Sequence, residues 1–165
     1  MEIYPATPND AQDMAYILNT SWSSTYAGII PNETIEARNA SRLQYILMAL
    51  EDHSENYYIV RQQQTPVAVM CFGPSIDEDT PRYTYEVMVM YVHPDYTRQG
   101  IGSRMMDYVV KQGKKLRMKR LKVWVLSLNT NAINFYKKNG FVADGKTKMQ
   151  RYGVILELMR MERKL

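Results

Sequence analysis

The segment from Tyr91 to Ser103 combines residue types that are suited to binding an anion. A loop carrying Arg98 leads to Gly100 and Gly102, and a helical pattern follows. Glycines let a ligand approach the backbone closely, and the unpaired N–H groups and dipole of a helix start favour negative charge. The segment predicts a diphosphate site, although a tight turn before a helix would show the same glycine spacing.

The glycine spacing excludes two common phosphate-binding motifs. A P-loop needs a Gly-Lys-Ser/Thr sequence, and none follows Gly100. A dinucleotide-binding fingerprint needs a third glycine after Gly102, and this glycine is missing. The predicted site is therefore of another type.

The elements around this segment predict a β-α-β unit. Apolar residues alternate from 83 to 92, which is typical of a strand. A helix with the buried stripe Ile101, Met105, Tyr108 and Val109 follows, and 121–126 has the composition of a second strand. A strand, a helix and a strand in this order favour a parallel pair.

The flanking regions complete an α/β domain. Residues 2–5 form a predicted strand, Thr7, Pro8 and Asp10 start a first helix, and a second helix begins near Asn32. Strands at 57–61 and 67–72 form a predicted hairpin. Asn129 caps a short helix that Asn139 and Gly140 terminate, and a last strand pair runs from Phe141 to near Arg160. We expect a mixed sheet in a single domain, 1–165.

Composition fits a soluble protein with one core. The 165 residues are 45% hydrophobic, and 21 Lys plus Arg against 17 Asp plus Glu leave a formal charge of +4. This excess is too small and too dispersed to indicate nucleic acid. The one cysteine, Cys71, favours a buried structural thiol in a reducing compartment. No secretion signal or apolar run of membrane length is found, so we expect a cytoplasmic protein and no membrane partner.

Two segments resemble the GNAT superfamily of acetyl-CoA-dependent N-acyltransferases. The strand Glu86 to Val92 with Gly100 and Gly102 is similar to the family's acetyl-CoA signature, although Thr97 occupies its first position and Arg98 is displaced by one. The segment from Asn129 to Phe141 resembles its second signature closely. The resemblance implies the order β-α-α-β-β-β-α-β-α-β-β, a central sheet that splays after the strand ending at Val92, and acetyl-CoA as cofactor.

The resemblance also implies roles for individual residues. Glu86 would be the general base, through water, and Tyr136 the general acid; a backbone N–H near a bulge at Met90 would stabilise the oxyanion. The alternative for Glu86 is a solvated glutamate on a strand, and the alternative for Tyr136 is packing in the core beside Phe135. The implied cofactor contacts are Met90, Tyr91, Val92, Arg98, Gln99, Gly100, Ile101, Gly102, Ser103, Asn129, Asn131, Phe135, Tyr136 and Lys138.

The acceptor side is less distinctive. The segment Ser21 to Pro31 resembles a GNAT subgroup that includes PaiA-like polyamine acetyltransferases, which implies that Trp22 and Tyr26, with Glu86, contact a small-molecule or peptide amine. Packing between helices is equally compatible with both rings. The acidic residues Asp77 to Asp79 could attract a cationic acceptor or be merely solvated. Homodimer formation is left open.

Three rival functions follow from further features. Lys111, Lys114, Lys115, Arg117, Lys119, Arg120 and Lys122 form a basic run that could contact nucleic acid, but its position at a helix C-terminus favours a solvated surface. Acetylation of protein N-termini or lysines is the second rival function, and acyl-CoA binding without catalysis is the third. His53, His93 and Cys71 lie too far apart in sequence for a zinc site, so we expect no metal.

Overall fold

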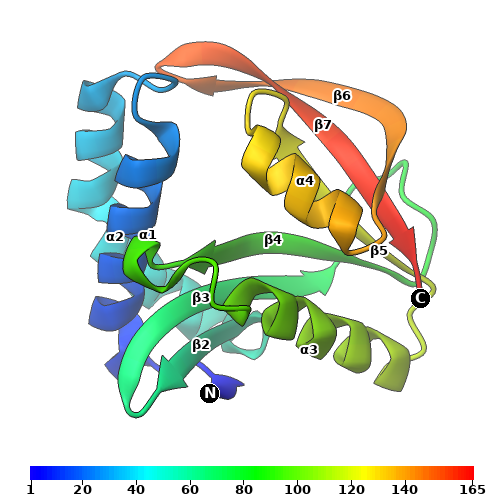
Figure 1. Ribbon diagram of the computed structural model, residues 1–165, viewed down its shortest axis with the longest axis horizontal. Helices are drawn as coiled ribbons and strands as arrows, with labels where there is room; N and C mark the ends of the chain where they lie inside the picture. The colour runs from blue at the N-terminus through cyan, green and yellow to red at the C-terminus, as the bar shows by residue number, and fades with distance from the viewer. The chain divides into compact units, whose positions relative to one another are not determined.

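The computed structural model describes residues 1–165, and its element order matches the prediction (Figure 1). The elements are β1 (Glu2–Pro5), α1 (Ala11–Tyr26), α2 (Asn32–His53), β2 (Tyr57–Gln62), β3 (Thr65–Pro74), β4 (Thr84–Val92), α3 (Ile101–Lys115), β5 (Arg120–Leu126), α4 (Thr130–Lys138), β6 (Val142–Tyr152) and β7 (Val154–Lys164). Short 3-10 turns stand at Pro8–Asp10, Ser54–Asn56 and Pro94–Tyr96. The strand order in the mixed sheet is β1-β2-β3-β4-β5-β7-β6. None of the helices has the length and apolar character needed to cross a bilayer.

The chain divides into two compact units, which are described separately. Unit 1 comprises Met1–Cys71 and Val89–Gly102, and unit 2 comprises Phe72–Met88 and Ser103–Leu165. The strands β3 and β4 each contribute residues to both units. A single domain over the whole chain therefore stays a prediction.

Unit 1 packs α1 and α2 with an antiparallel sheet of β1, β2 and β3. Its core includes Met14, Ile17, Ile46 and Ile59, which are at most 1% exposed. The predicted helix start is confirmed: the Asp10 carboxylate accepts hydrogen bonds from the Thr7 backbone N–H (2.9 Å) and hydroxyl (2.8 Å). The α-helix itself begins one turn later, at Ala11, because the proline turn is a 3-10 turn.

The hairpin in unit 1 is tighter than predicted. Its turn consists of Gln63 and Gln64, which both have positive φ (47° and 71°). Two left-handed residues match the twist of the flanking strands, so β2 extends to Gln62 and β3 starts at Thr65.

Unit 2 is a sheet of β4, β5, β7 and β6 with α3 and α4. The predicted parallel pair is confirmed between β4 and β5, and β6 and β7 form a long antiparallel hairpin with α4 beside it (Figure 1). β7 ends at Lys164 rather than near Arg160, because all of β5 pairs with it, from Arg120 opposite Lys164 to Leu126 opposite Leu158. Met105, Met106, Leu121 and Met161 are fully buried.

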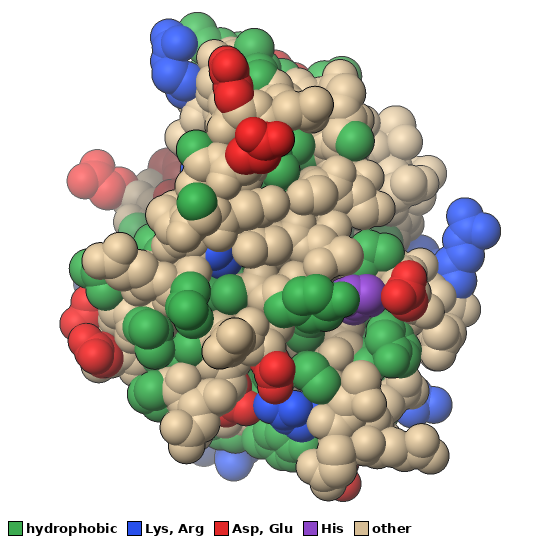
Figure 2. All heavy atoms as spheres, turned by 90° about the vertical axis from the view of Figure 1, so that its left-hand side faces the viewer, with side chains coloured by type: hydrophobic (Ala, Val, Ile, Leu, Met, Phe, Trp, Pro, Cys, Tyr) green, Lys and Arg blue, Asp and Glu red, His purple; other side chains and the backbone are tan.

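The surface charges are mixed in sign on the face drawn in Figure 2. Acidic and basic side chains stand singly or in small groups there, with hydrophobic side chains between them. No broad patch of one sign gathers on this face. The view agrees with the dispersed charge expected from composition, and it concerns this face alone.

Candidate active site

The loop between β4 and α3 has the backbone form of an anion site. Residues 97–102 are here called the diphosphate loop. Arg98 and Gly100 have positive φ (60° and 79°), and a β-carbon added to Gly100 would meet no atom within 4 Å. The loop's entry is held by Thr97 Oγ1, which donates to the Pro94 carbonyl (2.9 Å). Open space over a glycine at a helix start fits an approaching diphosphate.

The amides of this loop are not used by other segments of unit 1. Within unit 1, no backbone N–H from Arg98 to Gly102 donates to a carbonyl outside its own helix, and the side chains of Arg98 and Gln99 are exposed. Helix α3 begins at Ile101, so its first N–H groups have no partner within the helix. The loop residues therefore fit a bound diphosphate, and the contacts predicted for Arg98, Gln99, Gly100, Ile101 and Gly102 stay predictions.

The end of β4 in unit 1 contacts α1. Met90, Tyr91 and Val92 are half-buried. The Val92 carbonyl accepts a hydrogen bond from Ser21 Oγ (3.2 Å), and the hydroxyls of Tyr91 and Tyr26 are 3.0 Å apart. This strand end is thus fixed by helix α1.

The two aromatic residues predicted to line the acceptor site are buried in unit 1. Trp22 and Tyr26 are each 8% exposed, and their rings meet edge to face at 4.8 Å. The guanidinium groups of Arg38 and Arg42 lie 4.8 and 5.1 Å from the Trp22 ring centre. Burial favours a packing role for both rings, and the acceptor contact stays a prediction.

In unit 2, Glu86 stands on the last rung of the parallel ladder. The pairing of β4 with β5 covers only Thr84 with Arg120, Tyr85 with Leu121 and Glu86 with Lys122, although both strands continue. Glu86 and Lys122 are therefore the last residue pair of this ladder. The ladder thus ends at the carboxylate of the predicted general base.

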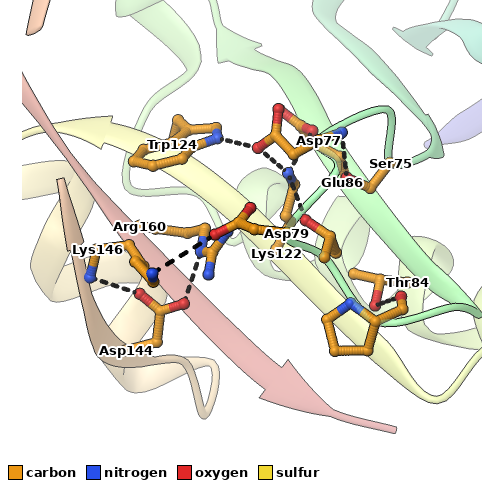
Figure 3. Close-up of polar contacts among 12 residues, drawn as sticks. Ser75, Asp77, Asp79, Thr84, Glu86, Lys122, Trp124, Asp144, Lys146 and Arg160 are labelled. Atoms are coloured by element: carbon orange, nitrogen blue, oxygen red, sulfur yellow. Dashed lines mark hydrogen bonds and ion pairs between the residues drawn. The ribbon is translucent and has the colours of Figure 1, made fainter. Parts of the chain in front are cut away.

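The Glu86 carboxylate is paired with a buried lysine (Figure 3). Glu86 Oε2 lies 3.1 Å from Lys122 Nζ, and the side chains are 14% and 0% exposed. The prediction that the basic run is a solvated helix end is wrong for Lys122. The reason is strand register: Lys122 lies on β5 opposite Glu86, and its side chain is enclosed there.

Lys122 belongs to a group that ties the β3–β4 loop to β5. Its ammonium contacts Asp77 Oδ2 and lies 3.3 Å from Thr80 Oγ1, and Trp124 Nε1 donates to the same Asp77 oxygen (2.8 Å). We call Asp77, Thr80, Glu86, Lys122 and Trp124 the polar cluster. Partial burial acts to raise the pKa of Asp77, but the hydrogen bonds from Lys122 and Trp124 outweigh it and hold this pKa below its ordinary value.

A second buried cation holds the same loop. Arg160 on β7 is 4% exposed, and it donates from Nη1 to Asp79 (2.8 Å) and from Nε to Asp144 (2.6 Å). Two of the three acidic loop residues, Asp77 and Asp79, are thus already neutralised by cations of the chain. This pairing counts against the idea that the loop attracts a cationic acceptor.

Helix α4 carries the remaining predicted residues of unit 2. Asn129 caps it as expected, because its Oδ1 accepts from the Ala132 N–H at 3.0 Å. Tyr136 is 8% exposed, and its ring packs edge to face on Phe135 (5.3 Å) and Phe141 (5.4 Å). The cap is confirmed, and the cofactor and acid roles stay predictions. So do the contacts predicted for Ser103, Asn131 and Lys138, none of which is buried.

Sequence reasoning missed the two buried cations of unit 2, Lys122 beside Glu86 and Arg160 beside Asp79. The alternation in β5 offered a signal for the first, because Leu121, Val123 and Val125 share one face and place Lys122 and Trp124 on the other. The charge density of the basic run hid this signal. Nothing in the sequence near Arg160 indicates its partners, which are 16 and 81 residues away.

Comparisons with known proteins agree with the expected family. The model of the acetyltransferase (GNAT) family matches residues 13–141. A spermidine N(1)-acetyltransferase of Thermoplasma acidophilum is 26% identical over 149 residues, which are 86% of this chain and 88% of the relative. An uncharacterized N-acetyltransferase of Methanocaldococcus jannaschii is 26% identical over 98 residues, 59% of this chain, and the match spans 43% of that relative's length.

Solved structures share the fold. The PaiA N-acetyltransferase from Thermoplasma acidophilum, in complex with coenzyme A, superposes with a TM-score of 0.80 at 22% identity and covers 99% of this chain and 98% of its own. The predicted fold is thereby confirmed. Because the family model spans most of the chain, the chain belongs to the acetyltransferase (GNAT) family of acetyl-CoA-dependent acyltransferases.

Proposed function

We propose that this protein transfers the acetyl group of acetyl-CoA directly to a primary amine, with Glu86 as general base and Tyr136 as general acid. The observation that carries the proposal is the placement of Glu86. It stands on the last rung of the parallel β4–β5 ladder, and its carboxylate is mostly buried and held by Lys122. A carboxylate that is held in one position suits proton transfer better than a solvated glutamate does.

A base is required because the acceptor is protonated at neutral pH. An alkylamine has a pKa of about 10.4, so deprotonation near pH 7.4 costs about 4 kcal/mol. Glu86 accepts this proton, directly or through one water, as the amine nitrogen forms its bond to the acetyl carbon. When bound, acetyl-CoA supplies the acetyl group as an activated thioester.

Other groups of the chain act on the carbonyl oxygen and on the sulfur of the thioester. A backbone N–H near Met90 stabilises the oxyanion, and Tyr136 gives its proton to the sulfur as the C–S bond breaks. The products are then the acetylated amine and coenzyme A with a free thiol. The diphosphate loop holds the diphosphate of the cofactor in this proposal.

For the acceptor we propose a small amine, with a polyamine as the first candidate. The support is the resemblance to a spermidine N(1)-acetyltransferase over most of both chains. Trp22 and Tyr26 would act indirectly, by fixing the β4 end through the Tyr26–Tyr91 hydroxyl contact. Peptide N-termini and lysine side chains are the second class of acceptor.

An assay of thiol release from acetyl-CoA tests the activity and the acceptor class together. The panel contains spermidine, putrescine, free amino acids, a peptide with a free N-terminus and a peptide with one lysine. We expect turnover to be highest with the polyamines. If calorimetry shows acetyl-CoA binding but every amine fails, the protein binds acyl-CoA without catalysis and the proposal is wrong.

Two substitutions test the assigned roles. Glu86→Gln should lower kcat about a hundredfold, and Tyr136→Phe at least about tenfold, with affinity for acetyl-CoA nearly kept, because both groups act in the transition state. Tyr45→Phe, at a tyrosine that is 65% exposed, is the matched control and should keep full activity. Unchanged kcat in either variant would remove that residue from the mechanism.

A further inference from the structure

We propose that Lys122 is a positioning residue: it fixes the Glu86 carboxylate in the orientation in which Glu86 accepts the proton of the acceptor amine. The inference rests on the proposed role of Glu86 and adds a residue that sits outside both family signatures. Lys122 does not itself contact the reacting atoms in this proposal.

The first support is the complete enclosure of an ammonium group. The Lys122 side chain is 0% exposed. Its three N–H donors meet three oxygen acceptors, one each from Asp77, Thr80 and Glu86. A desolvated ammonium is costly to bury, and here all its donors are satisfied, so the side chain is confined to one position.

The second support is that both partners are fixed by the backbone. Lys122 and Glu86 stand opposite each other on the last rung of the β4–β5 ladder. On the other side, Asp77 cannot swing away, because Trp124 Nε1 also donates to it. The ammonium is thus anchored on one side and holds Glu86 on the other (Figure 3).

Of the two carboxylate oxygens of Glu86, one is paired with Lys122 and the other is left for the proton transfer. Lys122 contacts Oε2, so Oε1 remains to accept a proton. A general base must lie within hydrogen-bond reach of the proton that it abstracts, and a displacement of about 1 Å can cost about a hundredfold in rate. Without Lys122, the carboxylates of Asp77 and Glu86 would repel each other, and Glu86 would turn away from this position.

Arg160 offers a matched control that separates the effect of losing a buried cation on stability from its effect on catalysis. It is also a buried cation with two carboxylate partners, and it anchors the same β3–β4 loop through Asp79. It contacts neither Glu86 nor Lys122 among its hydrogen bonds and ion pairs. Arg160→Gln should therefore cost stability but leave kcat near the original value.

The experiment compares Lys122→Met, Lys122→Arg and Arg160→Gln in kcat, in KM for acetyl-CoA and in thermal unfolding. We expect Lys122→Met to lower kcat at least about tenfold with KM for acetyl-CoA within about twofold, and Lys122→Arg to recover part of the loss. Lys122→Gln, which keeps a hydrogen-bond donor, replaces Lys122→Met if that variant does not fold.

A double-mutant cycle decides how Lys122 acts. If Lys122 works through Glu86, adding Lys122→Met to the Glu86→Gln variant should cause no further loss of kcat. A full additional loss in that background would overturn the inference, and so would equal losses of kcat in Lys122→Met and Arg160→Gln. If Glu86→Gln alone keeps its kcat, the general base itself is wrong. If kcat falls in Glu86→Gln but not in Lys122→Met, only the positioning role of Lys122 is refuted.

Discussion

The diphosphate loop and the polar cluster differ in the groups that they use: the loop uses backbone N–H groups, and the cluster uses charged side chains. The diphosphate loop offers backbone N–H groups, carries two residues with positive φ and leaves the side chains of Arg98 and Gln99 exposed. The polar cluster works through side chains, which neutralise one another around a fully buried lysine. One region is built to receive charge from outside the chain, and the other balances the charge that it contains.

This difference determines how each region responds to substitution. Backbone donors survive most side-chain changes, so the loop is sensitive mainly where a glycine is lost. A buried ion pair fails when one partner is removed, because the remaining charge stays in a poorly solvated place. Substitutions in the diphosphate loop should therefore weaken ligand binding. Substitutions of the buried cations should first lower the stability of the fold.

The largest expected effect is at Arg160. Arg160→Met leaves Asp144, whose side chain is 18% exposed, without its guanidinium partner. We expect a loss of about 2 kcal/mol in the free energy of unfolding, which is below the range of about 3–5 kcal/mol for a broken buried pair because Asp79 is half-exposed and can be solvated. Urea denaturation at pH 7 measures this value. A loss below about 0.5 kcal/mol would place the Arg160 pairs among ordinary surface ion pairs.

The two regions also differ in how well the sequence predicts them. The elements and the loop follow from local signals: the glycine pair, the Thr7–Asp10 capping box and the Asn129 cap are all read within a few residues. The polar cluster depends on β4 and β5 aligning Glu86 with Lys122 and on a loop that returns Asp77 to them. The register of two strands and the path of the loop that brings Asp77 to them are features of the tertiary structure, and no local sequence pattern encodes them.

The next effect contrasts two glycines in the same backbone conformation. Gly100 and Gly145 have φ of +79° and +86°, and neither has an atom within 4 Å of an added β-carbon. Alanine at either site should cost about 1 kcal/mol of stability from left-handed strain. Only Gly100→Ala places a methyl group where the diphosphate is proposed to bind, so we expect about tenfold weaker acetyl-CoA binding.

Calorimetry on both variants measures this contrast. Gly145→Ala, in the β6 strand of unit 2, should bind acetyl-CoA as the original chain does. If both variants bind acetyl-CoA as tightly as the original chain, the diphosphate does not lie over Gly100. Equal losses would instead indicate that strain, and not contact with the ligand, sets the affinity.

The smallest effect is a pH dependence that belongs to the polar cluster. Because the folded state holds the pKa of Asp77 below the ordinary value of 3.8, its ionised form stabilises the fold. This contribution is complete above the unfolded pKa and is lost as pH falls through the folded pKa, so it should fade only below about pH 4. Unfolding curves between pH 7 and pH 3 should therefore show a shallower acid loss in Asp77→Asn than in the original chain. Parallel curves would mean that Lys122 and Trp124 do not favour the charged form of Asp77, and the polar cluster would then lack the charge balance that separates it from the diphosphate loop.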